Sequence, residues 1–130
     1  MAEGDVRVDH EKLHSLGIRA LVAVGVAEEH ARMAADVLLR ADLRGIESHG
    51  FARFAEFYVG RTRQGLLNPR PNVHVVEETL AAATVDGDGG LGFVAGTIGM
   101  RLAIEKAQAT GIGMVTVRNS TTTGQPHPTR

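Results

Sequence analysis

The stretch from Gly45 to Arg53 reads GIESHGFAR and holds residue types that could handle a proton and an acid group. A histidine titrates near neutral pH, so His49 could donate or accept a proton, and Arg53 could bind a carboxylate through two parallel hydrogen bonds. Ser48 could cap a helix or hydrogen-bond the imidazole. At about 100° per residue, a regular helix would place Arg53 and Glu56 on the polar face of His49. This face suits a small carboxylic acid, and a merely solvated polar face is the simpler alternative.

A second histidine motif, HEKLHSLG at residues 10–17, matches the H-E-x-x-H pattern of zinc proteases. In that chemistry both histidines bind zinc and Glu11 acts as general base. The extended pattern requires a third ligand at position 20, where this chain has Ala20. We therefore expect no metal site here and interpret the motif as the start of an amphipathic helix.

The glycine run GDGGLG, Gly87–Gly92, matches G-x-G-x-x-G between a predicted strand and a predicted helix. In a dinucleotide-binding fold such glycines admit a pyrophosphate to the helix N-terminus. The acidic residue of that fingerprint is missing, because Arg118 and Asn119 stand near the end of the next strand. The alternative is a structural turn in which Asp86 and Asp88 bond nearby backbone groups.

Residues 1–66 are predicted to form a helical segment that carries the Ser-His-Gly motif. Asp9 caps a first helix that begins at His10 and ends at Gly25, and further helices are expected over 27–45 and 48–65. The apolar stripes of the three helices are Leu13, Leu16, Ala20, Leu21 and Val24; Ala31, Ala34, Ala35 and Leu38; and Phe51, Phe54, Ala55 and Tyr58.

The second half changes from helical to mixed character. A connector with two prolines and two asparagines occupies 67–72, and residues 73–120 are expected to form a partial cofactor-domain β-turn-α-β unit. Its strands are predicted at 73–78, 81–86 and 111–117, with a helix over 93–109 between the last two. The predicted fold class is mixed α/β, and residues 121–130 form a divergent tail. One side of this predicted helix carries Val94, Ile98 and Leu102.

Composition narrows the possible partners. The 130 residues are 43% hydrophobic, enough for one globular domain, and the net charge of −1 gives no field that would attract nucleic acid or an anionic membrane. There is no cysteine, which excludes disulfides and thiolate metal sites. No apolar run is long enough to span a membrane, and we expect a cytoplasmic protein.

Four motifs in order, ADLRGIESHGFARF, GLLNPRPN, VDGDGGLG and AIEKAQATGIGMVTVRNS, resemble the malate/L-lactate/ureidoglycolate dehydrogenase family. This is the non-Rossmann kind of malate and lactate dehydrogenase, typically a homodimer. The resemblance implies hydride transfer between NAD or NADP and a small 2-hydroxy or 2-oxo acid, or a related imino acid. By that likeness His49 exchanges the proton with the substrate, Ser48 orients or assists His49, and Arg53 binds the substrate carboxylate. The likeness also implies that the glycine run is a structural turn.

The resemblance weakens after residue 120. Family members continue into a motif like N-S-x-H-F-G, whereas this chain has Thr122 and Thr123 at the histidine and aromatic positions. Ser120 and Gly124 match the motif and are the candidate cofactor-binding residues. We therefore expect a truncated or frameshifted chain with negligible turnover alone. Two alternatives stay open: a non-catalytic remnant that self-associates, and a small dinucleotide-binding module that uses Gly87–Gly92.

Overall fold

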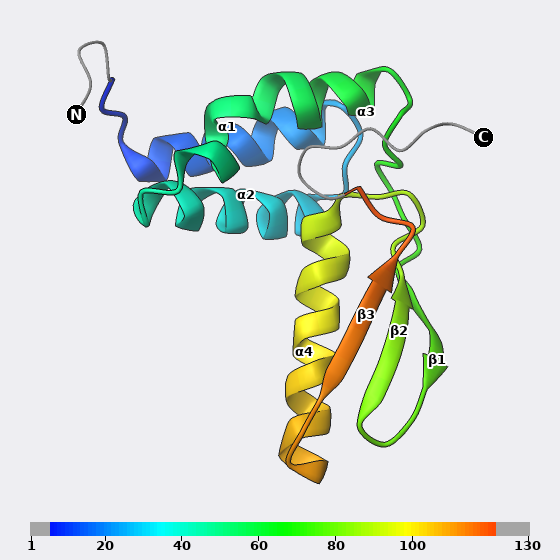
Figure 1. Ribbon diagram of the computed structural model, residues 1–130. Helices are drawn as coiled ribbons and strands as arrows, with labels where there is room; N and C mark the ends of the chain where they lie inside the picture. Colours follow the sequence, from blue (N-terminus) through cyan, green and yellow to red (C-terminus); the bar gives the residue numbers. More distant parts are fainter. Residues whose placement is uncertain (1–5, 122–130) are drawn as a thin grey trace.

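The computed structural model describes residues 6–121 (Figure 1). Helical elements gather at one end of the molecule, and a long helix and a small sheet extend away from them. This arrangement confirms the predicted mixed α/β class, with helices first and a β-α-β unit second. The elements in order are α1 His10–Ala23, α2 Glu28–Leu43, the short turns η1 Glu47–His49 and η2 Phe51–Arg53, η3 Phe54–Gly60, α3 Arg61–Arg63, β1 His74–Glu78, β2 Ala82–Asp86, α4 Gly92–Thr110 and β3 Met114–Arg118.

Helix α1 begins as its sequence predicts, because the Asp9 carboxylate accepts the Lys12 backbone N–H at 2.9 Å. Its buried face is built on Gly17 and Leu21. The prediction that Leu16 belongs to the apolar stripe is wrong, since its side chain is 57% exposed. Leu16 is rotated by about 100° from Gly17 around the helix axis, and this rotation turns it away from the packed face.

Helix α2 packs against α1, and all four residues of its predicted stripe, Ala31, Ala34, Ala35 and Leu38, are buried. Three of them are alanines, so the two helix backbones can approach closely. The helix ends at Leu43, and Gly45 then adopts a φ of +75°, which suits glycine.

The predicted single helix over 48–65 is wrong in its winding. The chain forms two 3₁₀ turns, η1 and η2, on either side of Gly50, then the π-helical η3 and the single turn α3. These turns have fewer or more residues than an α-helical turn, yet the rings of Phe51, Phe54 and Tyr58 still meet on one side, with centroids 5.0 and 6.4 Å apart in successive pairs. Phe54 is buried as predicted, whereas Ala55 is exposed and does not join the apolar side.

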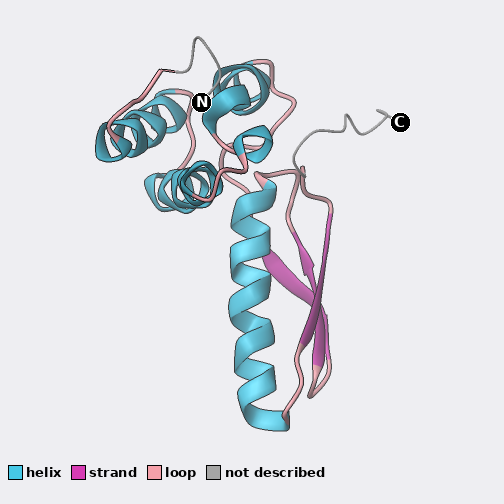
Figure 2. Cartoon of the chain, turned by 60° about the vertical axis from the view of Figure 1, so that its left-hand side comes forward, coloured by secondary structure: helices cyan, strands magenta, loops and turns pink. Residues whose placement is uncertain are grey.

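The sheet has the order β1-β2-β3, with β1 antiparallel and β3 parallel to β2. A bulge interrupts the first pairing between Val75 and Glu77, and the parallel register runs from Ala82↔Met114 to Asp86↔Arg118. Helix α4 makes the crossover between β2 and β3 and covers one face of the sheet (Figure 2). The predicted strands and helix are confirmed, with ends that shift by at most three residues.

One hydrophobic cluster joins the helices to the β-α-β unit. Leu21 and Leu38 from the helical layer pack in the same cluster as Leu67, Leu91 and Val94. Strand β1, by contrast, is exposed along its whole length. Within residues 6–121, no helix is both long and apolar enough to cross a membrane.

Candidate functional site

Ser48 and His49 lie together in η1, directly after the turn that ends α2. Ser48 Oγ and His49 Nδ1 are 2.8 Å apart, and both side chains are exposed. The hydrogen bond to Ser48 fixes the ring through one nitrogen. Nε2 is then the nitrogen that can exchange a proton with a ligand.

Arg53 is positioned by an aromatic ring rather than by a shared helix face. Its guanidinium carbon lies 5.3 Å from the centroid of the Phe57 ring, and that of Arg61 lies 4.9 Å from the same centroid. Stacking over a ring leaves the in-plane N–H groups able to bind a carboxylate. The predicted polar face of His49, Arg53 and Glu56 assumed a regular α-helix, and the break at Gly50 removes that basis.

Asp42 is a residue that the sequence interpretation missed. Its Oδ2 accepts the backbone N–H of Phe51 at 2.9 Å, and a Cβ built on Gly50 would overlap its carboxylate. A signal was present in the sequence, because Asp42 follows Leu38 by four residues and so continues the apolar stripe of α2. A half-buried carboxylate on such a stripe needs a hydrogen-bond partner, here the segment after His49.

The glycine run 87–92 is filled by the protein itself. The Asp88 carboxylate accepts the Asn72 N–H at 2.9 Å and the Asn68 side-chain amide at 3.1 Å. A Cβ on Gly90 would overlap the Pro71 ring, so the connector packs directly against this turn. These contacts favour the structural turn over the dinucleotide-binding module.

Asp86, the last residue of β2, lies directly before this glycine run at the same end of the sheet. Its carboxylate accepts the Asp88 N–H at 2.9 Å, the Asn119 side-chain amide at 3.1 Å and Arg118 Nε at 3.0 Å. The hydrogen bond from the Asp88 backbone, followed by those of Asn119 and Arg118, lowers the pKa of Asp86 below its ordinary value. Arg118 is therefore committed to a structural ion pair.

The two groups of predicted site residues do not come together. Ser120 follows β3 and is half-buried against Gly87, whereas η1 lies beyond the C-terminal end of α2, on the far side of the helical layer (Figure 1). Gly124 lies outside the described residues. Beside Ser120, the Asp86 carboxylate already accepts the Asp88 N–H and the Asn119 side-chain amide, so these two donors are engaged within the chain itself.

The H-E-x-x-H motif has a structural role in the described chain. His14 Nε2 lies 2.6 Å from Asp36 Oδ1 and ties α1 to α2, while His10 and Glu11 are exposed. No group of three or more histidine, cysteine or acidic side chains within residues 6–121 could hold a metal ion.

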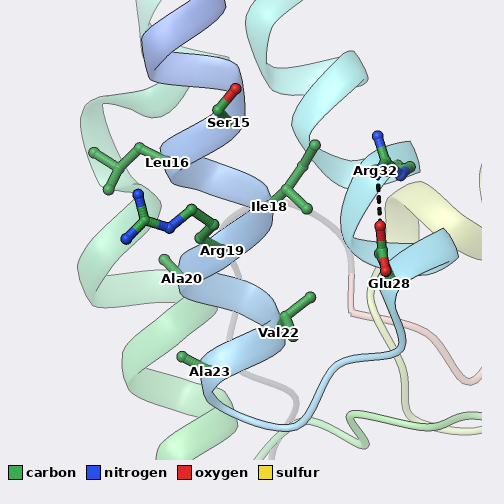
Figure 3. A pocket seen from close by; sticks show the side chains of 9 residues that line it. All are labelled: Ser15, Leu16, Ile18, Arg19, Ala20, Val22, Ala23, Glu28 and Arg32. Carbon is green, nitrogen blue, oxygen red and sulfur yellow. Dashed lines mark hydrogen bonds and ion pairs between the residues drawn. The ribbon is translucent and has the colours of Figure 1, made fainter.

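A shallow groove of about 780 Å³ lies elsewhere, along α1 and the first turns of α2 (Figure 3). Its rim includes Arg19 and the Glu28–Arg32 ion pair, and Ile18 and Val22 lie between them. None of its lining residues belongs to the segment 47–63, so this groove is separate from the candidate site.

Comparison with known proteins places this geometry in a family. The family of malate/L-lactate dehydrogenases matches residues 8–127. Malate dehydrogenase from Pyrococcus abyssi (strain GE5 / Orsay) is 47% identical over 118 residues, which cover 91% of this chain and 32% of that protein. Ureidoglycolate dehydrogenase (NAD(+)) from Escherichia coli (strain K12) is 37% identical over 85% of this chain and 31% of that protein.

A solved structure shows the same fold. Malate dehydrogenase from Pyrococcus horikoshii OT3 has a TM-score of 0.88 at 46% identity, covering 95% of this chain and 35% of that one. The chain thus spans about a third of the length of the relatives it matches. On the extent of the family match, the chain belongs to the malate/L-lactate dehydrogenase family.

Proposed function

We propose that this chain supplies the proton-transfer and carboxylate-binding part of an NAD(P)-dependent oxidoreductase that acts on a small 2-hydroxy or 2-oxo acid, or a related imino acid. The observation that carries the proposal is the Ser48–His49 hydrogen bond at 2.8 Å, with Arg53 four residues further on. Family membership and the names of the relatives support the reaction class.

His49 handles the proton in this proposal. Nδ1 is held by the Ser48 hydroxyl, so Nε2 faces the substrate oxygen. In reduction the imidazolium donates its proton to the carbonyl oxygen as that oxygen gains negative charge, and in oxidation the neutral ring accepts the hydroxyl proton. Ser48 keeps the ring in the orientation that this exchange requires.

Arg53 binds the acid group of the substrate. Its stacking on Phe57 fixes the plane of the guanidinium, and a fixed fork binds a carboxylate with two parallel hydrogen bonds. The aromatic support lowers the entropy lost when the acid binds. The carboxylate would then set the distance between the reacting carbon and His49.

A bound nicotinamide cofactor, NAD or NADP, would supply the hydride. The chain's candidate contributions to its binding are Ser120 and Gly124. A cytoplasmic location, where nicotinamide cofactors are regenerated, and a homodimeric assembly are parts of the same proposal.

Titration with oxamate, an unreactive analogue of a 2-oxo acid, tests the proposal on the chain itself. NMR should show shifts at the Arg53 Nε–H and the His49 ring, and Arg53→Ala should weaken binding at least about tenfold, the loss of one charged hydrogen-bonded contact. Arg63→Ala, an exposed arginine in α3, is the matched control. If oxamate shifts the His49 ring signals in Arg53→Ala at the same concentrations as in wild type, the assigned role is wrong.

Turnover is tested in a chimera. Residues 8–121 of this chain replace the matching part of the Pyrococcus horikoshii malate dehydrogenase, and NADH or NADPH oxidation is followed with oxaloacetate. His49→Asn should lower kcat by about 10²–10⁴-fold, the range for loss of a general acid, and His10→Asn should leave it unchanged. Equal loss in both variants, or none in His49→Asn, would contradict the proposal.

A second candidate function is self-association without catalysis. It is favoured by exposed apolar side chains on α4 and next to it, where Met100 is 63% and Ile112 is 67% exposed, and by β3, which is an edge strand of the sheet in the described residues. Sedimentation velocity decides it: Met100→Glu with Ile104→Glu should shift a dimer to monomer, and Leu80→Glu in the hairpin should not. A monomer at all concentrations removes this candidate.

A further inference from the structure

We propose that Asp42 is a positioning residue for the site, because its carboxylate fixes the backbone midway between His49 and Arg53. The functional meaning of this inference rests on the proposed function. The contact itself does not, and the experiment below measures the contact directly.

The carboxylate takes the place of a missing helix hydrogen bond. The N–H of Phe51 is the first of η2, and the first N–H groups of a helical turn have no partner within that turn. Asp42 Oδ2, on the last turn of α2, accepts this N–H at 2.9 Å from nine residues upstream. A hydrogen bond to a charged acceptor is stronger than one between neutral groups. The end of α2 therefore determines where the next helical segment begins.

Gly50 makes the approach possible. It is buried, and a Cβ at this position would overlap the Asp42 carboxylate. No residue with a side chain can occupy position 50 while Asp42 stays in place. The glycine of the Ser-His-Gly motif is therefore needed to make room for the Asp42 carboxylate, not for the His49 ring.

The side chain of Phe51 is held from the opposite direction. Its ring lies 2.7 Å from the position that a Cβ on Gly17 of α1 would take, and its centroid lies 5.0 Å from that of Phe54. Residue 51 is therefore fixed by α2 through its N–H and by α1 through its ring. His49 precedes this fixed point by two residues and Arg53 follows it by two. Release of the N–H frees the backbone on which both side chains depend.

The test compares Asp42→Ala and Asp42→Asn with Glu29→Ala, which removes an exposed carboxylate from the same helix. Amide hydrogen exchange at Phe51 reports the hydrogen bond. Two-bond ¹H–¹⁵N spectra of the His49 ring report its tautomer and its hydrogen bond to Ser48. A global loss of stability alone would change neither the tautomer in the folded state nor the signals of one segment.

In Asp42→Ala we expect Phe51 exchange to become at least about tenfold faster, the loss of a hydrogen bond to a charged acceptor. The His49 ring signals should move, while those of α4 and the sheet stay in place. Asp42→Asn keeps an acceptor oxygen, so it should restore most of the protection and move the Phe51 proton upfield because the acceptor is neutral. Glu29→Ala should leave Phe51 and His49 unchanged.

Unchanged Phe51 exchange and His49 signals in Asp42→Ala would overturn the proposal. If Asp42→Ala fails to fold, an unmoved Phe51 proton in Asp42→Asn would overturn it instead. Oxamate titration separates the two proposals. If the wild type does not bind oxamate, the carboxylate-binding role of Arg53 is refuted. A change in the NMR signals of the His49 ring in Asp42→Ala would still establish the positioning contact.

Discussion

The segment 47–63 and the turn 87–92 both combine glycines with polar side chains, and they use those side chains in opposite ways. In the turn, the carboxylates of Asp86 and Asp88 accept N–H groups of the chain itself. In the segment, Ser48, His49 and Arg53 are exposed, and Asp42 of α2 and Gly17 of α1 hold the backbone between them. Polar atoms that are already satisfied hold a fold, whereas exposed polar atoms on a supported backbone can act on a ligand.

The glycines differ in the same way. Gly90 lies against Pro71 of the connector, so its missing side chain lets two parts of the scaffold meet. Gly50 lies against Asp42, so its missing side chain lets a carboxylate hold the segment that carries the candidate site. A glycine-rich motif therefore has meaning only through the atoms that fill the space beside it.

The largest expected effect comes from Gly50→Ala. The new methyl group must displace the Asp42 carboxylate, which combines overpacking with the loss of a charged hydrogen bond, and the free energy of unfolding should fall by about 3 kcal/mol or more. Chemical denaturation measures it. Gly96→Ala on α4 is the control: no neighbouring atom lies within 4 Å, and it should stabilise by about 0.5–1 kcal/mol. Equal effects in both variants would contradict the account of Gly50.

Gly90→Ala should destabilise by about 1–3 kcal/mol, because the methyl group forces the turn away from the Pro71 ring. The measurement is the same denaturation series, together with the His49 ring spectrum in the folded state. Unaltered His49 signals keep the two regions separate. A change at His49 would show that the turn and the candidate site are coupled.

Most elements could be predicted from the sequence, because their signals are local. Each of these signals depends on residues that are close in sequence. Examples are the helix cap at Asp9, the alanine stripe of α2, and the strand before and helix after GDGGLG. The winding of 47–63 could not be predicted in this way. It depends on the hydrogen bond between the Asp42 carboxylate and the Phe51 N–H nine residues later, and on the packing of the Phe51 ring against Gly17 of α1. Periodicity within the segment contains neither contact.

The candidate site shows the same limit. The residue types of Ser48, His49 and Arg53 could be recognised, and the Ser48–His49 contact follows from adjacency. The support of Arg53 by Phe57 could also be recognised, because residues four apart are neighbours on a helix, whereas the break at Gly50 between His49 and Arg53 could not. Tertiary contacts set the local geometry in this segment, so sequence alone identifies its groups but not their arrangement.

A smaller effect concerns acid stability of the turn. Since the pKa of Asp86 is lowered in the folded state, its contribution to stability is fully present above the ordinary value of 3.8 and is lost as the pH falls through the lower folded pKa. Unfolding free energies measured from about pH 5 down to about pH 2 should decline less steeply in Asp86→Asn than in wild type. Parallel curves for the two proteins would show that the hydrogen bonds from Asp88, Asn119 and Arg118 do not favour the charged form.

The smallest effect is expected from the site itself. Ser48→Ala and His49→Ala remove exposed side chains that hydrogen-bond to each other, so each should change the free energy of unfolding by less than about 0.5 kcal/mol. The same denaturation series provides the measurement, with Gly50→Ala as the reference for a supporting residue. A loss of about 2 kcal/mol or more in either variant would mean that these side chains hold the fold. Near-neutral values, combined with a loss of turnover in the chimera, would mean that Ser48 and His49 act in catalysis and that the stability of this segment depends on its supporting residues Asp42, Gly50 and Phe51.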